Sequence, residues 1–275
     1  IRVWSALLLS LAVLALWLGR EEEGGGGVLS DLRSCIRGAV VEAKVRDGSL
    51  WKGLPRRVRA CAQRLHLEPW SYRNKDDVKT VLAMPTERDC SLLTLGIGGD
   101  VEAEKNFKAD HPRCYFAGID PDPGNSALYN DALSGEFQAT AVGTRTGVEE
   151  MSILVGRASY KRKLVNSTDF LELLSSFGRS RWDHLWMDIE GAEYDILGRY
   201  FLTGQIQQAG FHICQLNVEL HGPFDQYNVT TAEVEELLEE LMEKGNFWPF
   251  HMEEPGKHLR ASFLNAYSLQ CPIQL

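Results

Sequence analysis

The sequence predicts an α/β fold built around a mostly parallel sheet. From Ser91 onward, short apolar runs of strand length alternate with stretches of helical periodicity, as parallel sheets require. The first apolar run, residues 92–95, breaks into the glycine-rich turn Gly96-Ile97-Gly98-Gly99. The next run ends in Asp120, 22 residues after Gly98. A strand, a glycine turn and an acid at this distance are typical of a nucleoside-binding α/β domain.

The other elements follow in order along the chain. Three more short apolar runs are predicted to be strands: 116–119, 138–143 and 151–155. Ser167, Thr168 and Asp169 can cap a helix that extends through Phe177, with Gly178 as its end. Residues 184–189 and 213–220 are predicted to be buried strands, with a helix over 192–202 between them.

The last predicted helix begins with a capping box formed by Thr230 and Glu233. Its apolar residues recur at helical spacing: Val234, Leu237, Leu238, Leu241 and Met242. Gly245 ends it. Residues 247–252 and 261–269 are then predicted to form an antiparallel hairpin that finishes the sheet.

The residues around the glycine turn indicate which nucleoside would bind. A dinucleotide fingerprint needs a third glycine, but Val101 stands there. The three carboxylates of Asp100, Glu102 and Glu104 at the start of the next helix would repel a pyrophosphate. S-adenosylmethionine, a cationic nucleoside without phosphates, fits better. The candidate cofactor-binding residues are Gly96, Gly98, Gly99, Asp100 and Asp120, and a plain strand-to-helix turn without a ligand is the alternative.

A second group of polar residues follows two later strands. Asp188 and Glu190 come where one strand gives way to a helix, and Glu219 and His221 end the next strand. If the strands are adjacent, the four side chains face one another across a cleft at the carboxyl edge of the sheet. They could position and deprotonate a hydroxyl, with His221 as the general base. They could instead bind a divalent metal, although we predict none, or Glu190 and Glu193 could merely cap the following helix.

The run Met187-Asp-Ile-Glu-Gly-Ala-Glu193, after a glycine turn and a ribose acid and before Asn217-Val-Glu-Leu-His221, resembles the FkbM-type S-adenosylmethionine methyltransferases. It is more similar still to animal methyltransferase-like proteins that carry a membrane-anchored FkbM-related domain. The resemblance covers about residues 88–271.

This resemblance implies a class I methyltransferase fold, which is Rossmann-like: a seven-stranded sheet with helices on both faces and the last strand antiparallel. It also implies that Gly96, Gly98 and Asp120 contact S-adenosylmethionine, and it favours O-methylation of a hydroxyl on a small molecule or glycan. One departure lies in the glycine turn, because Gly99 precedes Asp100 and no glycine follows.

The N-terminal part indicates a membrane-anchored protein of the secretory pathway. Residues 3–18 are apolar and uncharged, near the lower limit for a membrane span, so we favour a signal anchor over 1–19 to a cleaved signal peptide of a secreted protein. Residues 20–27 form a charged, glycine-rich stem. Two glycosylation sequons, at Asn166 and Asn228, favour a domain in the ER or Golgi lumen.

The six cysteines show no zinc-binding spacing. Cys90 lies six residues before Gly96, and Cys114 lies six residues before Asp120. Parallel neighbouring strands would place these two cysteines side by side, so a Cys90–Cys114 disulfide is one hypothesis and two buried thiols the other. Cys214, within an apolar run, is predicted to be an ordinary core residue.

Charge divides the chain near residue 90. Residues 28–90 carry 13 Lys and Arg against 8 Asp and Glu, and the predicted methyltransferase domain from 91 to 275 carries 14 against 27. We expect a basic, helical extension over 28–90, with a helix from Pro55 to His66 whose arginines face solvent beside the acidic domain or meet an acidic substrate or lipid headgroups. A net charge of −9 argues against nucleic acid as a partner.

Two functions of other classes remain open. A lumenal glycosyltransferase could use Asp120-Pro121-Asp122 as an Asp-x-Asp triplet for a metal and a sugar nucleotide. A non-catalytic binding module could keep the fold without turnover. The sequence does not identify the acceptor, because acceptor pockets are built from loops.

Overall fold

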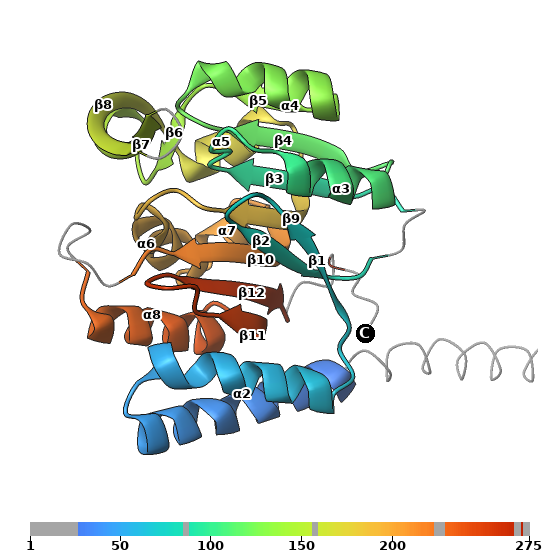
Figure 1. The fold of residues 1–275 in the computed structure, drawn as a ribbon, viewed down its shortest axis with the longest axis vertical. Helices are drawn as coiled ribbons and strands as arrows, with labels where there is room; N and C mark the ends of the chain where they lie inside the picture. The colour runs from blue at the N-terminus through green and yellow to red at the C-terminus, as the bar shows by residue number, and fades with distance from the viewer. Residues whose placement is uncertain (1–26, 85–87, 156–158, 223–228, 267–270, 272–275) are drawn as a thin grey trace, which may run out of the picture.

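The computed structural model describes residues 27–84, 88–155, 159–222, 229–266 and 271, and a seven-stranded sheet lies at its centre (Figure 1). The strands lie in the order β5 (Glu136–Gln138), β4 (Tyr115–Ile119), β3 (Ser91–Leu95), β9 (Arg181–Met187), β10 (His212–Leu220), β12 (Leu259–Asn265) and β11 (Phe247–Glu253). Within this sheet β12 is antiparallel to both of its neighbours, and β5, β4, β3, β9 and β10 run parallel. The predicted α/β fold with an antiparallel last strand is confirmed.

Helices cover both faces of the sheet because successive strand residues point to opposite sides. Leu92 and Phe116 pack with α3 (Glu102–Asp110) and α4 (Ser126–Leu133) in one core. Leu93 and Ala117 belong to the core on the opposite face. The elements that supply that second core include α5 (Phe170–Ser176), α6 (Glu193–Ile196), η3 (Leu197–Phe201), α7 (Gln205–Gln208) and α8 (Thr231–Glu243).

Two of the predicted helix starts are present. The side chain of Asp169 accepts hydrogen bonds from the backbone N–H groups of Leu171 (2.9 Å) and Glu172 (3.4 Å), and α5 begins at the next residue. Thr230 and Glu233 form the reciprocal capping box of α8. Polar caps of this kind satisfy the backbone donors that a helix start leaves unpaired.

The N-terminal helices pack on the sheet rather than forming a separate unit. A helix over 27–42 and the π-helical turn η1 (Ala43–Asp47) precede α2 (Leu50–Arg64), which lies against β11 (Figure 1). The expected helix start at Pro55 is wrong, because α2 begins at Leu50 with Ser49 as its cap. Burial of Leu50 and Leu54 in the core outweighs the one backbone hydrogen bond that a proline inside the helix removes.

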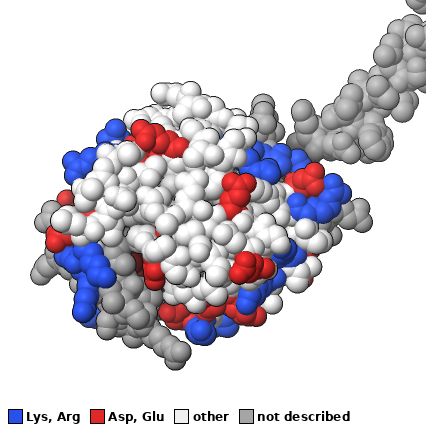
Figure 2. Space-filling view, turned by 90° about the horizontal axis from the view of Figure 1, so that it is seen from above, with Lys and Arg blue, Asp and Glu red and all other residues white. Residues whose placement is uncertain are grey.

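The basic residues of this part pair with acidic residues of the domain. Arg37 contacts Glu243 of α8 at 3.0 Å, and Lys44 pairs with Glu239 of the same helix. The charge division near residue 90 is therefore matched, in part, by ion pairs between the two parts of the fold. In the face of the molecule shown in Figure 2, basic and acidic side chains are interspersed around a largely uncharged centre.

The segment 28–90 is not helical throughout. Strands β1 (Pro69–Arg73) and β2 (Val78–Leu82) form an antiparallel hairpin where we expected only helix. The side-chain amide of Gln215 on β10 pairs with both backbone groups of Leu82, at 2.9 and 3.0 Å, and Asn217 donates to the carbonyl of Thr80. The hairpin is therefore held by polar side chains of the central sheet, a contact that periodicity alone does not reveal.

A second, three-stranded sheet has the order β6 (Ala141–Gly143), β8 (Ser159–Asp169), β7 (Gly147–Val155). The run 138–143, predicted to be one strand, is divided between β5 of the large sheet and β6 of this one. Strand β8 was not predicted, because its sequence SYKRKLVNSTD is mostly polar. Its position comes from the long antiparallel pairing with β7.

Three disulfides join all six cysteines: Cys35–Cys61, Cys90–Cys114 and Cys214–Cys271. The proposed Cys90–Cys114 pair is confirmed, and its residues precede β3 and β4, whose first residues, Ser91 and Tyr115, are direct neighbours. The prediction that Cys214 is an ordinary core residue is wrong, because Cys214 forms a disulfide with Cys271, 57 residues further along the chain. Nothing in the sequence of β10 indicates that Cys271 lies beside it.

The predicted signal anchor over 1–19 and nearly all of the stem lie outside the described residues. Among the helices that the structure does describe, none combines the length and apolar character needed to cross a bilayer.

Candidate active site

A cavity lies at the carboxyl ends of β3, β4 and β9. It has an empty volume of about 1140 Å³ measured to its open mouth. All five predicted cofactor-binding residues line it, together with Asp188 and Glu190: Gly96, Gly98, Gly99, Asp100 and Asp120. The structure thus brings the glycine loop and the first part of the second polar group to one cavity. Such an edge is where open α/β sheets bind ligands.

The glycine loop needs glycine for two reasons. Gly96, Gly98 and Gly99 have φ angles of 81°, 63° and 80°, a region that other residues avoid. At Gly96 a Cβ atom would also lie 1.8 Å from the carbonyl oxygen of Asp188, so the two strand ends can approach only without a side chain. At Gly98 a Cβ atom would meet no other atom within 4 Å, so the loop faces open space there.

Asp120 holds the glycine loop in place. Its Oδ2 accepts hydrogen bonds from the backbone N–H groups of Ile97 at 2.9 Å and Gly98 at 3.1 Å. Its Oδ1 accepts from the N–H of Asp122 at 2.8 Å. A carboxylate can accept about four hydrogen bonds, so capacity remains for a ligand hydroxyl. Asp120 therefore orders the loop and borders the cavity at once.

Asp100 has a comparable role at the start of α3. Its Oδ1 accepts from the backbone N–H of Glu102 at 3.1 Å, and its Oδ2 accepts from the N–H of Lys75 at 2.9 Å. Lys75 lies in the turn of the β1–β2 hairpin, so this carboxylate fastens the hairpin to the glycine loop. Its position on the cavity wall is predicted by the sequence, and its contact with the hairpin is not.

Glu104 is a cavity residue that sequence reasoning did not select. It is buried on α3 and lines the cavity, with its Oε1 accepting a hydrogen bond from the hydroxyl of Thr94 at 3.1 Å. Its Oε2 has no hydrogen-bond partner among the described residues. Burial raises the pKa of this carboxyl to about 7. A signal was present, since α3 packs against the sheet with one face and Glu104 falls on it with Phe107.

The four predicted catalytic residues do come together. Strands β9 and β10 are parallel neighbours, so Asp188 and Glu190 after β9 lie next to the end of β10. The Nε2 atom of His221 lies 3.4 Å from Oδ1 of Asp188 and 3.3 Å from Oε2 of Glu190. Glu190 has a φ of 58°, a strained value for a residue with a side chain, and strain of this kind is often found at functional sites.

Glu193 contacts His221 at the ring nitrogen that does not face Asp188 and Glu190. Its carboxylate is fully buried, and its Oε1 lies 2.8 Å from Nδ1 of His221 and accepts the backbone N–H of His221 at 2.9 Å. Its Oε2 accepts the N–H of Gly191 at 2.8 Å. Glu193 therefore connects the turn after β9 to the end of β10. The alternative in which it merely caps the following helix is not what the structure shows.

The surroundings of His221 argue against the expected base role. Burial alone would lower the pKa of His221, but Glu190, Glu193 and Asp188 raise it to about 12. An imidazole protonated at neutral pH has no lone pair that can accept a proton. Burial raises the pKa of Asp188 to about 7, so a carboxylate is the better proton acceptor here.

Glu219 is not among the residues that line the cavity, and it has a basic partner. Its Oε2 contacts Nε of Arg260 on β12 at 3.2 Å, and the same Nε atom lies 3.0 Å from Oδ1 of Asp77. Asp77 also pairs with Lys79, which is buried on β2. The sequence prediction included neither basic residue, because both come from elements distant in sequence or unpredicted.

The two carboxylates of the Asp-x-Asp triplet, Asp120 and Asp122, both accept hydrogen bonds from backbone N–H groups. Asp120 accepts three backbone N–H groups, and Oδ1 of Asp122 accepts the N–H of Gly124 at 2.9 Å at the start of η2 (Pro123–Asn125). Both side chains thus shape the turn after β4.

With this geometry established, comparison with known families is decisive. The model of the methyltransferase FkbM domain matches residues 61–246. The chain belongs to the FkbM methyltransferase family. This membership makes it an S-adenosylmethionine-dependent methyltransferase by family and fold, as the run Met187–Glu193 indicated. The match begins within α2 and includes the β1–β2 hairpin, which lies in the expected extension over 28–90.

The chain also matches several solved structures at low sequence identity. The fibrillarin pre-rRNA processing protein of Methanococcus jannaschii has 14% identity and a TM-score of 0.38, with 72% of this chain and 82% of that chain covered. Human methyltransferase-like protein 13, solved in complex with SAH, has 13% identity and a TM-score of 0.39, with 68% and 76% covered. A putative caffeoyl-CoA O-methyltransferase from Staphylococcus aureus has 10% identity and a TM-score of 0.35, with 64% and 76% covered. No curated protein matches the sequence closely enough to count as a relative.

Proposed function

We propose that this FkbM-family protein transfers a methyl group from S-adenosylmethionine to a hydroxyl of a small molecule or glycan. The observation that carries the proposal is the shared cavity, in which the glycine loop and Asp120 lie next to the carboxylates of Asp188 and Glu190. A nucleoside site and a group that can accept a proton are thereby adjacent, as transfer to a hydroxyl requires.

The residues present suit a cationic nucleoside. Asp120 keeps acceptor capacity at the end of β4, where ribose hydroxyls bind in comparable folds. The buried Oε2 of Glu104 borders the cavity without a partner among the described residues, and a positively charged ligand group would satisfy it. Pyrophosphate would instead meet the acidic start of α3.

The chain's own contribution is alignment and proton removal. When bound, S-adenosylmethionine supplies a sulfonium methyl group, which the acceptor oxygen takes as a C–O bond forms and the C–S bond breaks. Asp188 and Glu190 orient the acceptor hydroxyl from the cavity wall, and a carboxylate oxygen of one of them accepts its proton. His221, held by Glu193, fixes the positions of both carboxylates.

Incubation with S-adenosylmethionine labelled on the methyl group tests the activity. A panel of sugars, glycans and small hydroxyl compounds should include acceptors that gain the label, and Asp188→Asn should lower the rate by about 10²-fold or more. A matched control is Asp131→Asn on α4, away from the cavity, which should retain the wild-type rate. Binding of the cofactor without label transfer to any acceptor would contradict the proposal and favour a non-catalytic binding module.

We also propose that the domain faces the lumen of the ER or Golgi, anchored through residues 1–19, or is secreted if that segment is cleaved. Three disulfides are typical of an oxidising compartment, and the sequon at Asn166 lies exposed on β8. Protein from cultured cells should shift in mass on treatment with an N-glycosidase, and Asn166→Gln should remove part of that shift. A chain that carries no glycan and is degraded by protease added to intact microsomes would contradict this location.

A further inference from the structure

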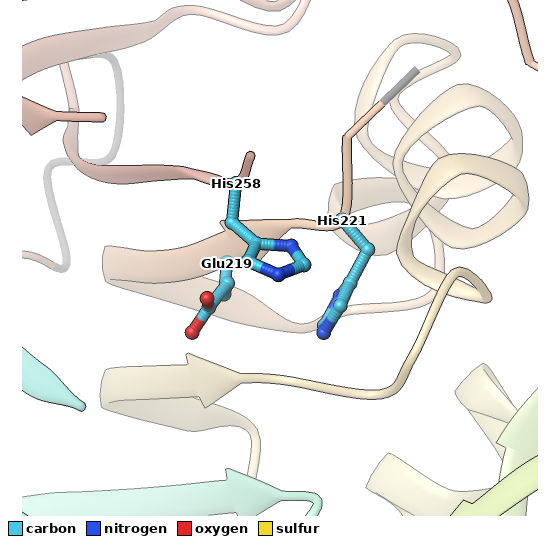
Figure 3. A group of neighbouring side chains, drawn as sticks. All are labelled: Glu219, His221 and His258. Carbon is cyan, nitrogen blue, oxygen red and sulfur yellow. The ribbon is translucent and has the colours of Figure 1, made fainter. Parts of the chain in front are cut away.

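His221 is shared by two groups of side chains that can bind metal. Its ring and the carboxylates of Asp188 and Glu190 present ligand atoms that all lie within 4.8 Å of one another. The same holds for His221 with Glu219 and His258. Figure 3 shows the second group, with the ring of His258 between the carboxylate of Glu219 and the ring of His221. The centroids of the two imidazole rings are 4.9 Å apart.

Two separations within the first group match those of ligands around one ion. Nε2 of His221 lies 3.4 Å from Asp188 and 3.3 Å from Glu190. Charge-assisted hydrogen bonds between nitrogen and oxygen are shorter, at about 2.7–2.9 Å. Ligand atoms placed tetrahedrally at about 2.0–2.1 Å from a zinc-sized ion are roughly 3.3–3.4 Å apart.

A second observation comes from outside these ligands. The fully buried carboxylate of Glu193 lies 2.8 Å from Nδ1 of His221 and so favours the tautomer with its proton on that atom. Binding of an ion would displace the proton that Nε2 carries in the metal-free protein, and the Nε2 lone pair would then face the ion beside Asp188 and Glu190. Histidines that bind metals almost always have their other ring nitrogen held by such a carboxylate or a backbone oxygen.

The other acidic residues nearby are already paired. Glu219 contacts Arg260 at 3.2 Å, and Asp77 pairs with Lys79. We propose that Asp188, Glu190 and His221 bind one divalent transition-metal ion. The mixture of imidazole and carboxylate favours an ion such as Mn²⁺ or Zn²⁺ over Mg²⁺ or Ca²⁺, which prefer oxygen alone.

This inference rests on the proposed function for its chemical meaning, because Asp188 and Glu190 also border the cavity of the glycine loop. An ion held there would lower the pKa of an acceptor hydroxyl. A strong base would then be unnecessary, and a carboxylate oxygen that is not on the ion could take the proton. The acceptor would be an oxygen compound that can approach a metal, such as a sugar or a catechol-like diol.

Titration of the chelator-treated full chain with Mn²⁺, followed by calorimetry and by electron paramagnetic resonance of the free ion, tests the site without any cofactor. We expect one ion per chain. His221→Ala and Glu190→Gln should each weaken binding at least about 10-fold, and Glu193→Gln should weaken it about 10- to 100-fold without touching the ion. The control His66→Asn, at an exposed turn after α2 and outside the groups of side chains that can bind metal, should bind like wild type.

Circular dichroism of each variant shows whether it is folded, and Glu190→Gln, on a partly exposed turn, is the substitution that the fold should tolerate best. Absence of Mn²⁺ binding to the wild-type chain would overturn the inference, as would unchanged affinity in folded Glu190→Gln and Glu193→Gln. Titration of the same samples with S-adenosylmethionine separates the two proposals. Metal binding without cofactor binding would contradict the proposed function and leave the metal site supported.

Discussion

Gly96 and Gly98 have similar backbone angles but different surroundings. Both have positive φ angles, yet only Gly96 lies against another strand end, with the carbonyl oxygen of Asp188 where a Cβ atom would be. A methyl group at Gly98 would strain the backbone alone, and a methyl group at Gly96 would also separate β3 from the turn after β9. The two glycines therefore form a matched pair for separating backbone strain from steric overlap.

We expect Gly98→Ala to lower the free energy of unfolding by about 1–2 kcal/mol, the usual cost of a left-handed residue with a side chain. Gly96→Ala should cost more than about 3 kcal/mol, because the backbone itself must move. Urea denaturation of both variants measures the difference. Equal losses in the two variants would show that the contact of Gly96 with Asp188 does not limit the fold.

Glu104 should make stability depend on pH. Its pKa in the folded protein is raised to about 7, above the unfolded value of 4.5, because its carboxyl is buried. The folded state therefore holds this proton more tightly, and the stabilisation present below pH 4.5 is lost as the pH rises through 7. Glu104→Gln stays neutral, so between pH 4 and pH 8 the wild type should lose about 3 kcal/mol relative to it. Parallel pH profiles of the two unfolding free energies would contradict this account.

At the scale of elements, the sequence predicted the parts that follow a simple period. The apolar runs of β3, β4, β9 and β10 and the capped helices α5 and α8 were located, because burial and capping leave marks within a few residues. The β1–β2 hairpin and strand β8 were missed, because amides of β10 hold the first and pairing with β7 positions the second. The sequences of these strands predict them only when their distant partners in the fold are known.

The candidate site shows the same division. Asp188, Glu190 and His221 were predicted to meet because they follow strands that the pattern marks as neighbours. Glu104, Arg260 and the buried ion pair of Lys79 escaped prediction, since each reaches the site across the fold from another element. The base role of His221 stays a prediction, and the contact that bears on it, with Glu193, is one that only the structure reveals.

The Cys90–Cys114 disulfide fastens β3 to β4 at the end of the strands away from the cavity. It closes a loop with a sequence separation of 24 residues. The double variant Cys90→Ala/Cys114→Ala should lower the free energy of unfolding by about 2–4 kcal/mol, mainly because the unfolded chain gains freedom. Cofactor affinity of the folded variant should change little. Alkylation of both thiols in the native wild-type protein, with no loss of stability in the variant, would contradict the assignment.

For the whole molecule, one sheet edge gathers residues from β2, β3, β4, β9, β10, α3 and the loop before β12. The N-terminal helices pack into one of the two cores beside this sheet, and the three disulfides join Cys35 to Cys61, Cys90 to Cys114 and Cys214 to Cys271. The fold thus holds the glycine loop with Asp120, and Asp188 with Glu190, around one cavity. The central claim is that S-adenosylmethionine binds at the glycine loop and Asp120.

Calorimetric titration with S-adenosylmethionine tests that claim most directly. The account predicts one site per chain, and it predicts that Asp120→Ala weakens binding about 10- to 100-fold, since it removes both the loop's anchor and the ribose acceptor. Asp122→Ala, two residues away and directed at the turn of η2, should change affinity far less. A chain that does not bind S-adenosylmethionine but binds a sugar nucleotide with Mn²⁺, equally sensitive to both substitutions, would contradict the account.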